Sequence, residues 1–165
     1  FMPLYEKTKQ RHDFVPYSRK MIESQVDIFN ESGRPDVGAY LVFAQYQGKD
    51  VAGGIFFQFG KTVFYYHGAS MKVAGADGAA QLLQWEAIKE AKRRGATRFN
   101  FWGIAPDSAP GAESGKKHPF AGITTFKKGF GGYAIPYMHA QDLSLSFGYW
   151  KLWAADTYRK WKRGF

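Results

Sequence analysis

Residues 82–96 read LLQWEAIKEAKRRGA, and they predict the helix from which the rest of the fold can be placed. Three basic residues, 92–94, fill its last turn, where positive charge complements the helix dipole, and Gly95 supplies the stop. Asp77 is expected to cap its first turn. Its apolar residues recur at the three- and four-residue spacing of a helix that buries one face: Ala80, Leu83, Ala87, Ile88 and Ala91.

The segments on either side of this helix predict two neighbouring strands. Residues 62–70 (TVFYYHGAS) and 97–102 (TRFNFW) are rich in the aromatic and β-branched side chains that suit a pleated surface. A strand, a helix and a second strand of one sheet almost always connect as a right-handed crossover between parallel strands. We therefore expect residues 62–70 and 97–102 to run parallel in one sheet.

An antiparallel meander is predicted before this unit. Strands over 39–47, 51–59 and 62–70 are separated by short polar joints, which suit hairpins. Glycines 53 and 54 inside the second strand indicate a bulge or a close approach by another backbone. By analogy of element order, the sequence predicts an α+β protein with an acetyltransferase-like (GNAT) fold, in which helices flank a mixed central sheet.

Shorter elements are predicted towards the two ends of the chain. A polar helical turn begins near Leu4 and breaks at Pro16, and Ser18 caps a helix that runs to about Phe29. The later elements are a Gly- and Pro-rich loop over 103–117, a short helix near Ile123 that ends at Gly129, strands over 133–137 and 141–145, and a last helix capped by Ser146 with Phe147, Trp150, Ala154, Tyr158 and Trp161 on one face.

Length and composition limit the class of protein. With 165 residues, 45% of them hydrophobic and 18% aromatic, the chain is expected to form a single domain over residues 1–165. The lack of cysteine excludes disulfides, thiolate nucleophiles and thiolate metal sites.

No apolar run reaches the roughly 20 residues that span a bilayer, so a cytoplasmic protein is expected. Its first residue is Phe rather than Met, which indicates processing, a tag or a longer parent chain.

The charge of the chain points to an anionic partner. Its formal net charge of +9 favours RNA, a nucleotide or an acidic membrane surface. The basic residues gather in four clusters, and together these favour a functional basic surface, although each alone is compatible with a solvated face. The clusters lie at residues 89–94, 116–117, 127–128 and 159–163.

Residues 120–132 (FAGITTFKKGFGG) place two lysines beside aromatic rings at the end of the predicted short helix. On charge and spacing alone, Lys127 and Lys128 are compatible with a dipole-complementing role in a last helical turn. Phe126 and Phe130 flank them, so the stretch also sets fixed positive charge next to flat apolar side chains.

Five segments carry a resemblance to a known family: YYHGAS (65–70), LLQWEAIKEAKRRGA (82–96), FNFWGI (99–104), FAGITTFKKGFGG (120–132) and DLSL (142–145). In their order and intervals they resemble the Fem aminoacyltransferases, the FemABX family, over most of the chain. The resemblance implies transfer of an amino acid from aminoacyl-tRNA to the stem-peptide amine of a nucleotide- or lipid-linked peptidoglycan precursor. It thus implies a role in cell-wall biogenesis and cell shape.

The chain resembles the second of the two acetyltransferase-like domains of such enzymes. A missing N-terminal domain, or a second chain that supplies it, is therefore an expected partner, together with aminoacyl-tRNA and the muropeptide precursor. Peripheral contact with a membrane is compatible with a lipid-linked precursor. The resemblance implies aminoacyl-tRNA as co-substrate and no separate cofactor.

The resemblance also implies roles for particular residues. Lys127 would stabilise the oxyanion formed when an amine attacks the aminoacyl ester, and Phe126 would exclude water. Tyr65 and Tyr66 would face the muropeptide, and substrate binding is also assigned to Lys128 and to Arg11, which lies in the segment that contacts nucleotide or phosphate groups. The four histidines show no metal-ligand spacing, so no metal site is expected.

Two other functions remain open on sequence. An acyl-coenzyme A-dependent N-acyltransferase would need an anion-binding turn before the helix at 82–96. The corresponding stretch, KVAGADG (72–78), places Asp77 where phosphate would lie, which disfavours this function. A non-catalytic basic module that binds RNA or docks to a partner is the third possibility, and the single-domain length favours it.

Overall fold

The computed structural model describes residues 1–12, 16–105, 120–138 and 141–163, with backbone alone at residue 12 and at residues 160–163. The chain divides into two compact units, residues 1–102 and 103–165, and each is described by itself. The single domain over 1–165 therefore stays a prediction. Residues 106–119, which hold most of the predicted loop and the basic pair 116–117, lie outside the described part of the chain.

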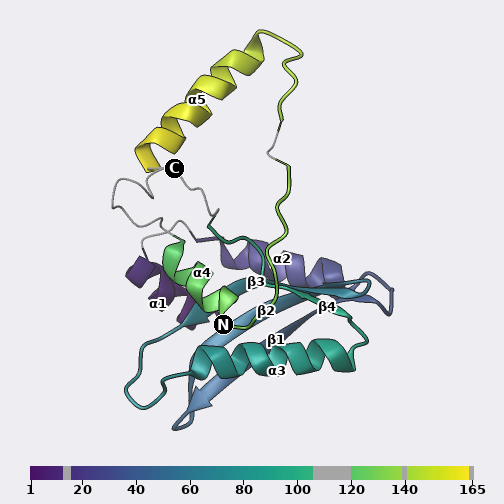
Figure 1. The fold of residues 1–165 in the computed structure, drawn as a ribbon, viewed down its shortest axis with the longest axis vertical. Helices are drawn as coiled ribbons and strands as arrows, with labels where there is room; N and C mark the ends of the chain where they lie inside the picture. Colours follow the sequence, from purple (N-terminus) through teal and green to yellow (C-terminus); the bar gives the residue numbers. More distant parts are fainter. Residues whose placement is uncertain (13–15, 106–119, 139–140, 164–165) are drawn as a thin grey trace. The chain divides into compact units, whose positions relative to one another are not determined.

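The first unit is a four-stranded mixed sheet with helices on both faces (Figure 1). The strands follow the order β1-β2-β3-β4, antiparallel from β1 to β3 and parallel between β3 and β4. This arrangement confirms the predicted α+β acetyltransferase-like fold, including the meander and the parallel strand after the long helix. The elements are α1 (Met2–His12), α2 (Arg19–Asn30), β1 (Val37–Tyr46), β2 (Lys49–Phe59), β3 (Thr62–Ser70), α3 (Ala79–Arg93) and β4 (Arg98–Asn100).

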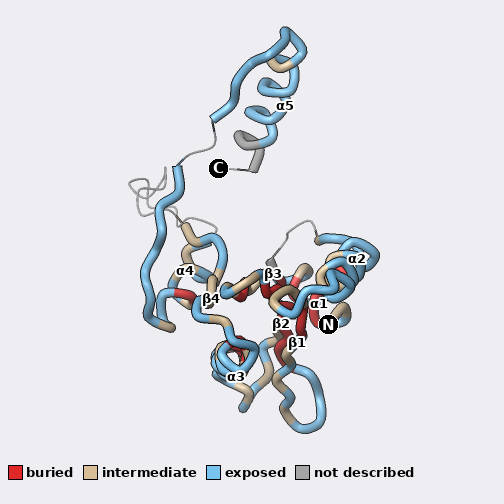
Figure 2. The backbone as a smooth tube through the Cα atoms, turned by 90° about the vertical axis from the view of Figure 1, so that its right-hand side faces the viewer, coloured by how far each residue is buried: buried red, intermediate tan, exposed pale blue. Residues whose placement is uncertain are grey.

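Strand β2 is the centre of this unit, because its residues from Val51 to Gln58 are buried (Figure 2). Alternate side chains point to opposite faces of a strand, so β2 contributes to two cores. Ile55 and Phe57 pack with α1 and α2 on one face, and Phe56 packs with α3 on the other. The sheet is thus covered on both faces, as its near-continuous apolar strand requires.

A β-bulge interrupts the pairing of β2 with β3. Ile55 pairs with His67 and Phe56 pairs with Tyr65, which leaves Tyr66 as the extra residue. The bulge lies next to the predicted glycine pair. A Cβ added at Gly54 would lie 2.8 Å from the Phe56 ring, so the close approach here is by a side chain rather than by another backbone.

The ends of α1 and α3 agree only in part with those predicted. Helix α1 is a full helix over Met2–His12 rather than a polar turn, because Leu4 and Tyr5 are buried against the sheet. Asp77 does not cap α3: Gly78, in the left-handed conformation, takes the cap position and no side chain caps it. Gly95 follows the end of α3 with φ +77°, which confirms the predicted stop.

Ser18 caps α2 as predicted, since its side-chain oxygen accepts a hydrogen bond from the Met21 N–H at 3.2 Å. We expect Ser18→Ala to lower the free energy of unfolding by about 0.5–2 kcal/mol, because one helix-end donor loses its partner. Chemical denaturation measures this change. Ser24→Ala, at an exposed site inside the same helix, is the matched control and should have little effect or a slightly stabilising one. Equal losses in the two variants would contradict the cap.

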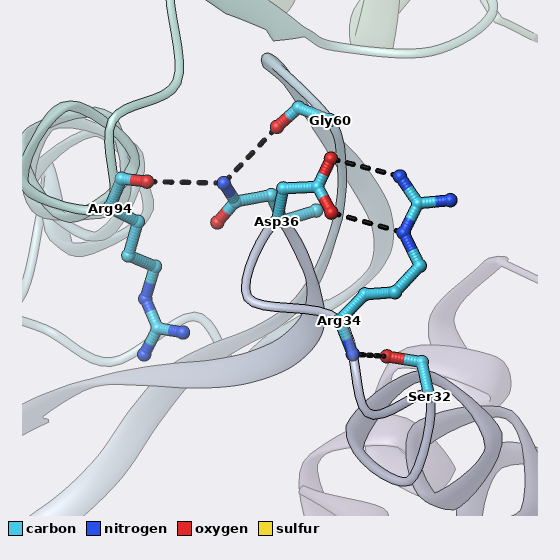
Figure 3. A network of polar contacts seen from close by, with 6 residues as sticks. Ser32, Arg34, Asp36, Gly60 and Arg94 are labelled. Atoms are coloured by element: carbon cyan, nitrogen blue, oxygen red, sulfur yellow. Dashed lines mark hydrogen bonds and ion pairs between the residues drawn. The ribbon is translucent and has the colours of Figure 1, made fainter.

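Polar side chains tie the edges of this unit together (Figure 3). The Gln58 amide donates to the Gly60 carbonyl at 3.3 Å and to the Arg94 carbonyl at 3.2 Å, which joins the β2–β3 turn to the end of α3. Arg34 forms a bidentate pair with Asp36, at 3.1 and 3.0 Å, and holds the pKa of that carboxyl below its usual value. Both partners are exposed, so the pair orders the loop before β1 more than it stabilises the fold.

The second unit contains α4 (Ala121–Lys128) and α5 (Gly148–Arg163). The strands predicted over 133–137 and 141–145 are wrong. No described residue of this unit belongs to a β-ladder, so an extended segment there has no strand to pair with. Helix α5 begins two residues after Ser146, whose carbonyl accepts from the Tyr149 N–H at 3.1 Å. In the described part of the chain, no helix has the length and apolar character to cross a bilayer.

Candidate functional site

Helix α4 ends where the sequence predicts. Its last residue is Lys128, Gly129 is the cap residue, and Gly131 and Gly132 adopt positive φ angles of 74° and 89°. The Gly131 N–H donates to the Lys128 carbonyl at 3.1 Å, which satisfies one of the carbonyls that a helix end leaves open. The glycines therefore stop the helix directly after the two lysines.

The two adjacent lysines have different environments. Lys128 is exposed, whereas Lys127 is only 7% exposed and its ammonium donates to the Gly103 carbonyl at 2.6 Å. Burial disfavours the charged form and lowers the pKa of Lys127 to about 8. A lysine that merely complemented the helix dipole would stay in solvent. Lys127 is therefore the lysine of this pair that is buried in the protein, whereas Lys128 is the exposed one.

A hydroxyl holds the chain segment that carries the Gly103 carbonyl. Thr124 Oγ1, on α4, accepts from the Ala105 N–H at 2.8 Å and donates to the Phe120 carbonyl at 2.7 Å. Thr124 thereby fixes the partner of Lys127 to the same helix. The sequence does not single out this residue, because a threonine inside a helix gives no sign of a partner 19 residues away.

Phe126 is half-buried and meets the Phe130 ring edge to face, with centroids 5.4 Å apart. Aromatic pairs of this geometry hold each other's orientation. Both rings come from the last turn of α4 and the residues just after it. The stretch thus combines a buried ammonium with an aromatic pair on flanking residues, and a preorganised ammonium is one kind of donor that can stabilise an oxyanion.

Tyr65 and Tyr66 lie on opposite faces of the sheet. Tyr65 stacks on Phe56 at 5.4 Å in the core under α3, and burial raises its pKa to about 12. Its hydroxyl lies over Gly68. The Gln84 side chain is near enough to lower that pKa slightly, but its Oε1 has no partner of hydrogen-bond geometry.

Tyr66, the bulge residue, packs on the face covered by α1 and α2. It meets Phe57, His67 and Trp102 edge to face, at 5.5, 4.8 and 5.0 Å between ring centroids. His67 is buried, bonds Gln25 at 2.9 Å, and has its pKa lowered by burial. It is therefore placed as a neutral structural side chain.

Arg11 lies at the end of α1, exposed to solvent, and donates to the Ser70 hydroxyl at 3.2 Å. The site residues inferred from the sequence thus form two groups. Arg11, Tyr65 and Tyr66 belong to the first unit, and Phe126, Lys127 and Lys128 belong to the second. No three potential metal ligands of the His, Cys, Asp or Glu type gather anywhere in the described ranges.

The basic cluster at residues 89–94 is partly neutralised by two glutamates on its own helix. Lys89 pairs with Glu86 at 2.6 Å, and Glu90 pairs with Arg93 and Arg94 at 3.0 and 2.6 Å. The Arg94 guanidinium also lies over the Tyr40 ring, 4.5 Å from its centroid. These contacts are typical of a solvated helix face, so this cluster gives little support to an RNA-binding surface.

Comparison with known proteins identifies the family of the chain. The model of the FemAB family matches residues 39–144. Aminoacyltransferase FemA of Staphylococcus aureus strains MW2 and COL is 31% identical over 88 residues, which are 53% of this chain and 20% of FemA. The chain therefore spans about a fifth of the length of the curated relatives it matches.

A crystal structure described as that of "a probable acetyltransferase" has the same fold, with a TM-score of 0.52 at 15% identity over 87% of this chain and 89% of that one. At this identity the likeness concerns the fold alone. The family match is different in kind, because it covers more than half of the chain and includes most of β1 and all of β2–β4, α3, α4 and the Lys127 stretch. The chain belongs to the FemAB family.

Proposed function

We propose that the chain is part of an aminoacyltransferase that moves an amino acid from aminoacyl-tRNA to the stem-peptide amine of a peptidoglycan precursor. Membership of the FemAB family and similarity to FemA support this reaction class. The observation that carries the proposal is the burial of the Lys127 ammonium at the end of α4. Aminoacyl-tRNA places the reaction in the cytoplasm, with a nucleotide-linked precursor or a lipid-linked one at the membrane surface.

The reaction is the aminolysis of an ester. The acceptor amine attacks the ester carbonyl carbon, the new C–N bond forms, and the C–O bond to the tRNA ribose breaks. A proton leaves the amine and reaches the ribose oxygen. Between these events the carbonyl oxygen carries a negative charge, and a preorganised cation in a site with little water stabilises it strongly.

Lys127 has the donors for this role. An ammonium offers three N–H groups, and the Gly103 carbonyl accepts from one of them. With its pKa at about 8, Lys127 remains mainly protonated near neutral pH. Phe126 and Phe130 would limit water around it. Substrate binding stays predicted for Lys128 in the second unit and for Tyr65, Tyr66 and Arg11 in the first unit. Since the chain spans a fifth of FemA, we propose that a further domain or a second chain completes the enzyme.

A transfer assay tests the proposal. The protein, alone and with a domain that completes it, is incubated with aminoacyl-tRNA charged with a radiolabelled amino acid and with a muropeptide precursor. We expect the label to appear in the precursor. Release of the label as free amino acid without any transfer, in both preparations, would contradict the proposed function.

The acetyltransferase-like fold supports a second candidate, an acyl-coenzyme A-dependent N-acyltransferase. The turn before α3 is poorly suited to a pyrophosphate. Asp77 is exposed there. Two backbone N–H groups at this turn and at the start of α3 already have partners: the Ala76 N–H donates to the Val73 carbonyl at 3.0 Å, and the Ala79 N–H donates to the Ala76 carbonyl at 3.2 Å. Calorimetric titration with acetyl-coenzyme A separates the candidates, because tight binding would favour the second.

A further inference from the structure

Trp102 has an unusual backbone conformation. Among the described residues, only Gln47 and Trp102 have positive φ without being glycine. Gln47 precedes Gly48, also at positive φ, in the β1–β2 hairpin turn, where such angles are normal. Trp102 has φ +66° outside any hairpin, and this conformation is rare for a bulky residue. Strained backbone of this kind concentrates at ligand-binding sites.

Specific contacts hold Trp102 in this conformation. Its backbone N–H donates to Asn100 Oδ1 at 2.7 Å. Its ring meets Tyr66 at 5.0 Å with a 62° angle between planes, and Phe64 at 5.9 Å with an angle of 81°. The residue nevertheless remains 54% exposed. The strain therefore orients a ring at the surface rather than burying it.

The bulge of β3 supplies the support behind this ring. Because Tyr66 is the extra residue of the bulge, its side chain lies on the same face as that of His67. Tyr66 contacts Phe57 in the core and Trp102 at the surface. A continuous series of rings thus connects the exposed indole to the rigid centre of the sheet.

The position of Trp102 in the sheet is typical of a ligand site. The parallel ladder between β3 and β4 ends at the pair Phe64–Asn100. Trp102 follows two residues later, beyond the carboxyl end of β4. Ligands of open α/β sheets bind at the carboxyl ends of parallel strands, where the chains diverge.

We propose that Trp102, supported by Tyr66, is a stacking platform for the nucleobase at the single-stranded 3′ end of tRNA. This inference rests on the proposed function, and it names the part of the aminoacyl-tRNA that the first unit would bind. Unpaired bases at RNA ends are recognised by stacking on aromatic side chains. The net charge of +9 favours the RNA backbone as well.

The experiment compares two RNA hairpins that mimic the tRNA acceptor stem, one ending in CCA and one with an abasic nucleotide in place of the terminal adenosine. Fluorescence anisotropy gives the Kd of each RNA at one fixed salt concentration. Four proteins are used: the unchanged chain, Trp102→Ala, Trp102→Phe, and Trp85→Ala. Trp85 is the matched control, because it is 56% exposed on α3.

We expect the unchanged chain to bind the CCA hairpin roughly tenfold or more tightly than the abasic one. Trp102→Ala should lose this preference, Trp102→Phe should keep most of it, and Trp85→Ala should leave it unchanged. No preference in the unchanged chain, a preference that survives Trp102→Ala, or an equal loss in Trp85→Ala would overturn the proposal. If Trp102→Ala fails to fold by circular dichroism, Trp102→Leu, which keeps an apolar side chain without a ring, takes its place and should likewise lose the preference.

The RNA-binding measurement and the transfer assay can give opposite outcomes, and each outcome rejects a different proposal. A base preference that depends on Trp102, in a protein that transfers nothing with any completing domain, would keep the platform and reject the transferase. Transfer activity without any base preference would keep the transferase and reject the platform.

Discussion

Lys127→Met is expected to lower the rate of aminoacyl transfer roughly 10²-fold or more, which is the typical cost of removing one donor to a developing oxyanion. Methionine keeps a long apolar side chain in the buried position, so the packing at the end of α4 changes little. The ammonium that bonds the Gly103 carbonyl is lost. The measurement is the single-turnover rate with saturating precursor, which excludes effects on product release.

Lys92→Met is the matched control for this variant. Lys92 also occupies the last turn of a helix, α3, but it is exposed. Its loss should leave the transfer rate within about twofold, since exposed charges contribute little. Equal losses of rate in Lys127→Met and Lys92→Met would mean that a general loss of positive charge, and not a buried ammonium, is responsible.

Stability measurements test the burial of the Lys127 ammonium independently of aminoacyl transfer. The pKa of Lys127 is about 8 in the folded protein and 10.5 for an unperturbed lysine, so between these values the unfolded chain binds a proton that the folded chain does not. The burial penalty is complete below pH 8 and is relieved as the pH rises to 10.5. As the pH rises from about 8 to 10.5, the free energy of unfolding of the unchanged chain should therefore increase relative to that of Lys127→Met.

Gly68→Ala is expected to have the largest effect on stability, a loss of about 1–3 kcal/mol from overpacking. A Cβ at position 68 would overlap the Tyr65 hydroxyl oxygen and the ring carbon that bears it. Tyr65 has little room to move, because it stacks on the fully buried Phe56 under α3. Chemical denaturation of the purified protein gives the change in free energy of unfolding.

A double-mutant cycle tests the cause of this loss. In a Tyr65→Leu background the shorter side chain leaves space for the new methyl group, so Gly68→Ala should cost much less than it does alone. Gly122→Ala is the control, because nothing lies within 4 Å of its added Cβ and alanine favours the α4 helix. An unchanged cost of Gly68→Ala in the Tyr65→Leu background would show that the clash with Tyr65 is not the cause.

Local sequence patterns predict much of the first unit. The apolar spacing of residues 80–91, the stop at Gly95 and the cap at Ser18 depend on neighbours within a few residues, and each is confirmed. The strands at 133–137 and 141–145 fail because strand formation needs a partner that the local sequence does not specify. The failure at Asp77 is local, since the left-handed Gly78 takes the cap position instead.

The candidate site depends on contacts that are distant in sequence. The burial of Lys127 involves Gly103, 24 residues earlier, so the lysine pair alone could not show which member is buried. The orientation of Tyr66 follows from the register of β3 on β2, and the ring of Trp102, which follows β4, packs against Tyr66 on β3. Alternation along the strand would place Tyr66 on the face opposite both Tyr65 and His67, but the bulge moves it to the face of His67.

The dependence of the transfer rate on pH, compared between the unchanged chain and Lys127→Arg, tests the central role of the Lys127 ammonium most directly. Lys127 loses its proton as the pH rises through about 8, whereas an arginine stays protonated. We predict that the single-turnover rate of the unchanged chain falls above pH 8, and that in Lys127→Arg, at whatever absolute rate, this fall is absent. The same falling limb in both proteins, or a rate that rises through pH 8 only when Lys127 is present, would contradict an ammonium that acts by its charge.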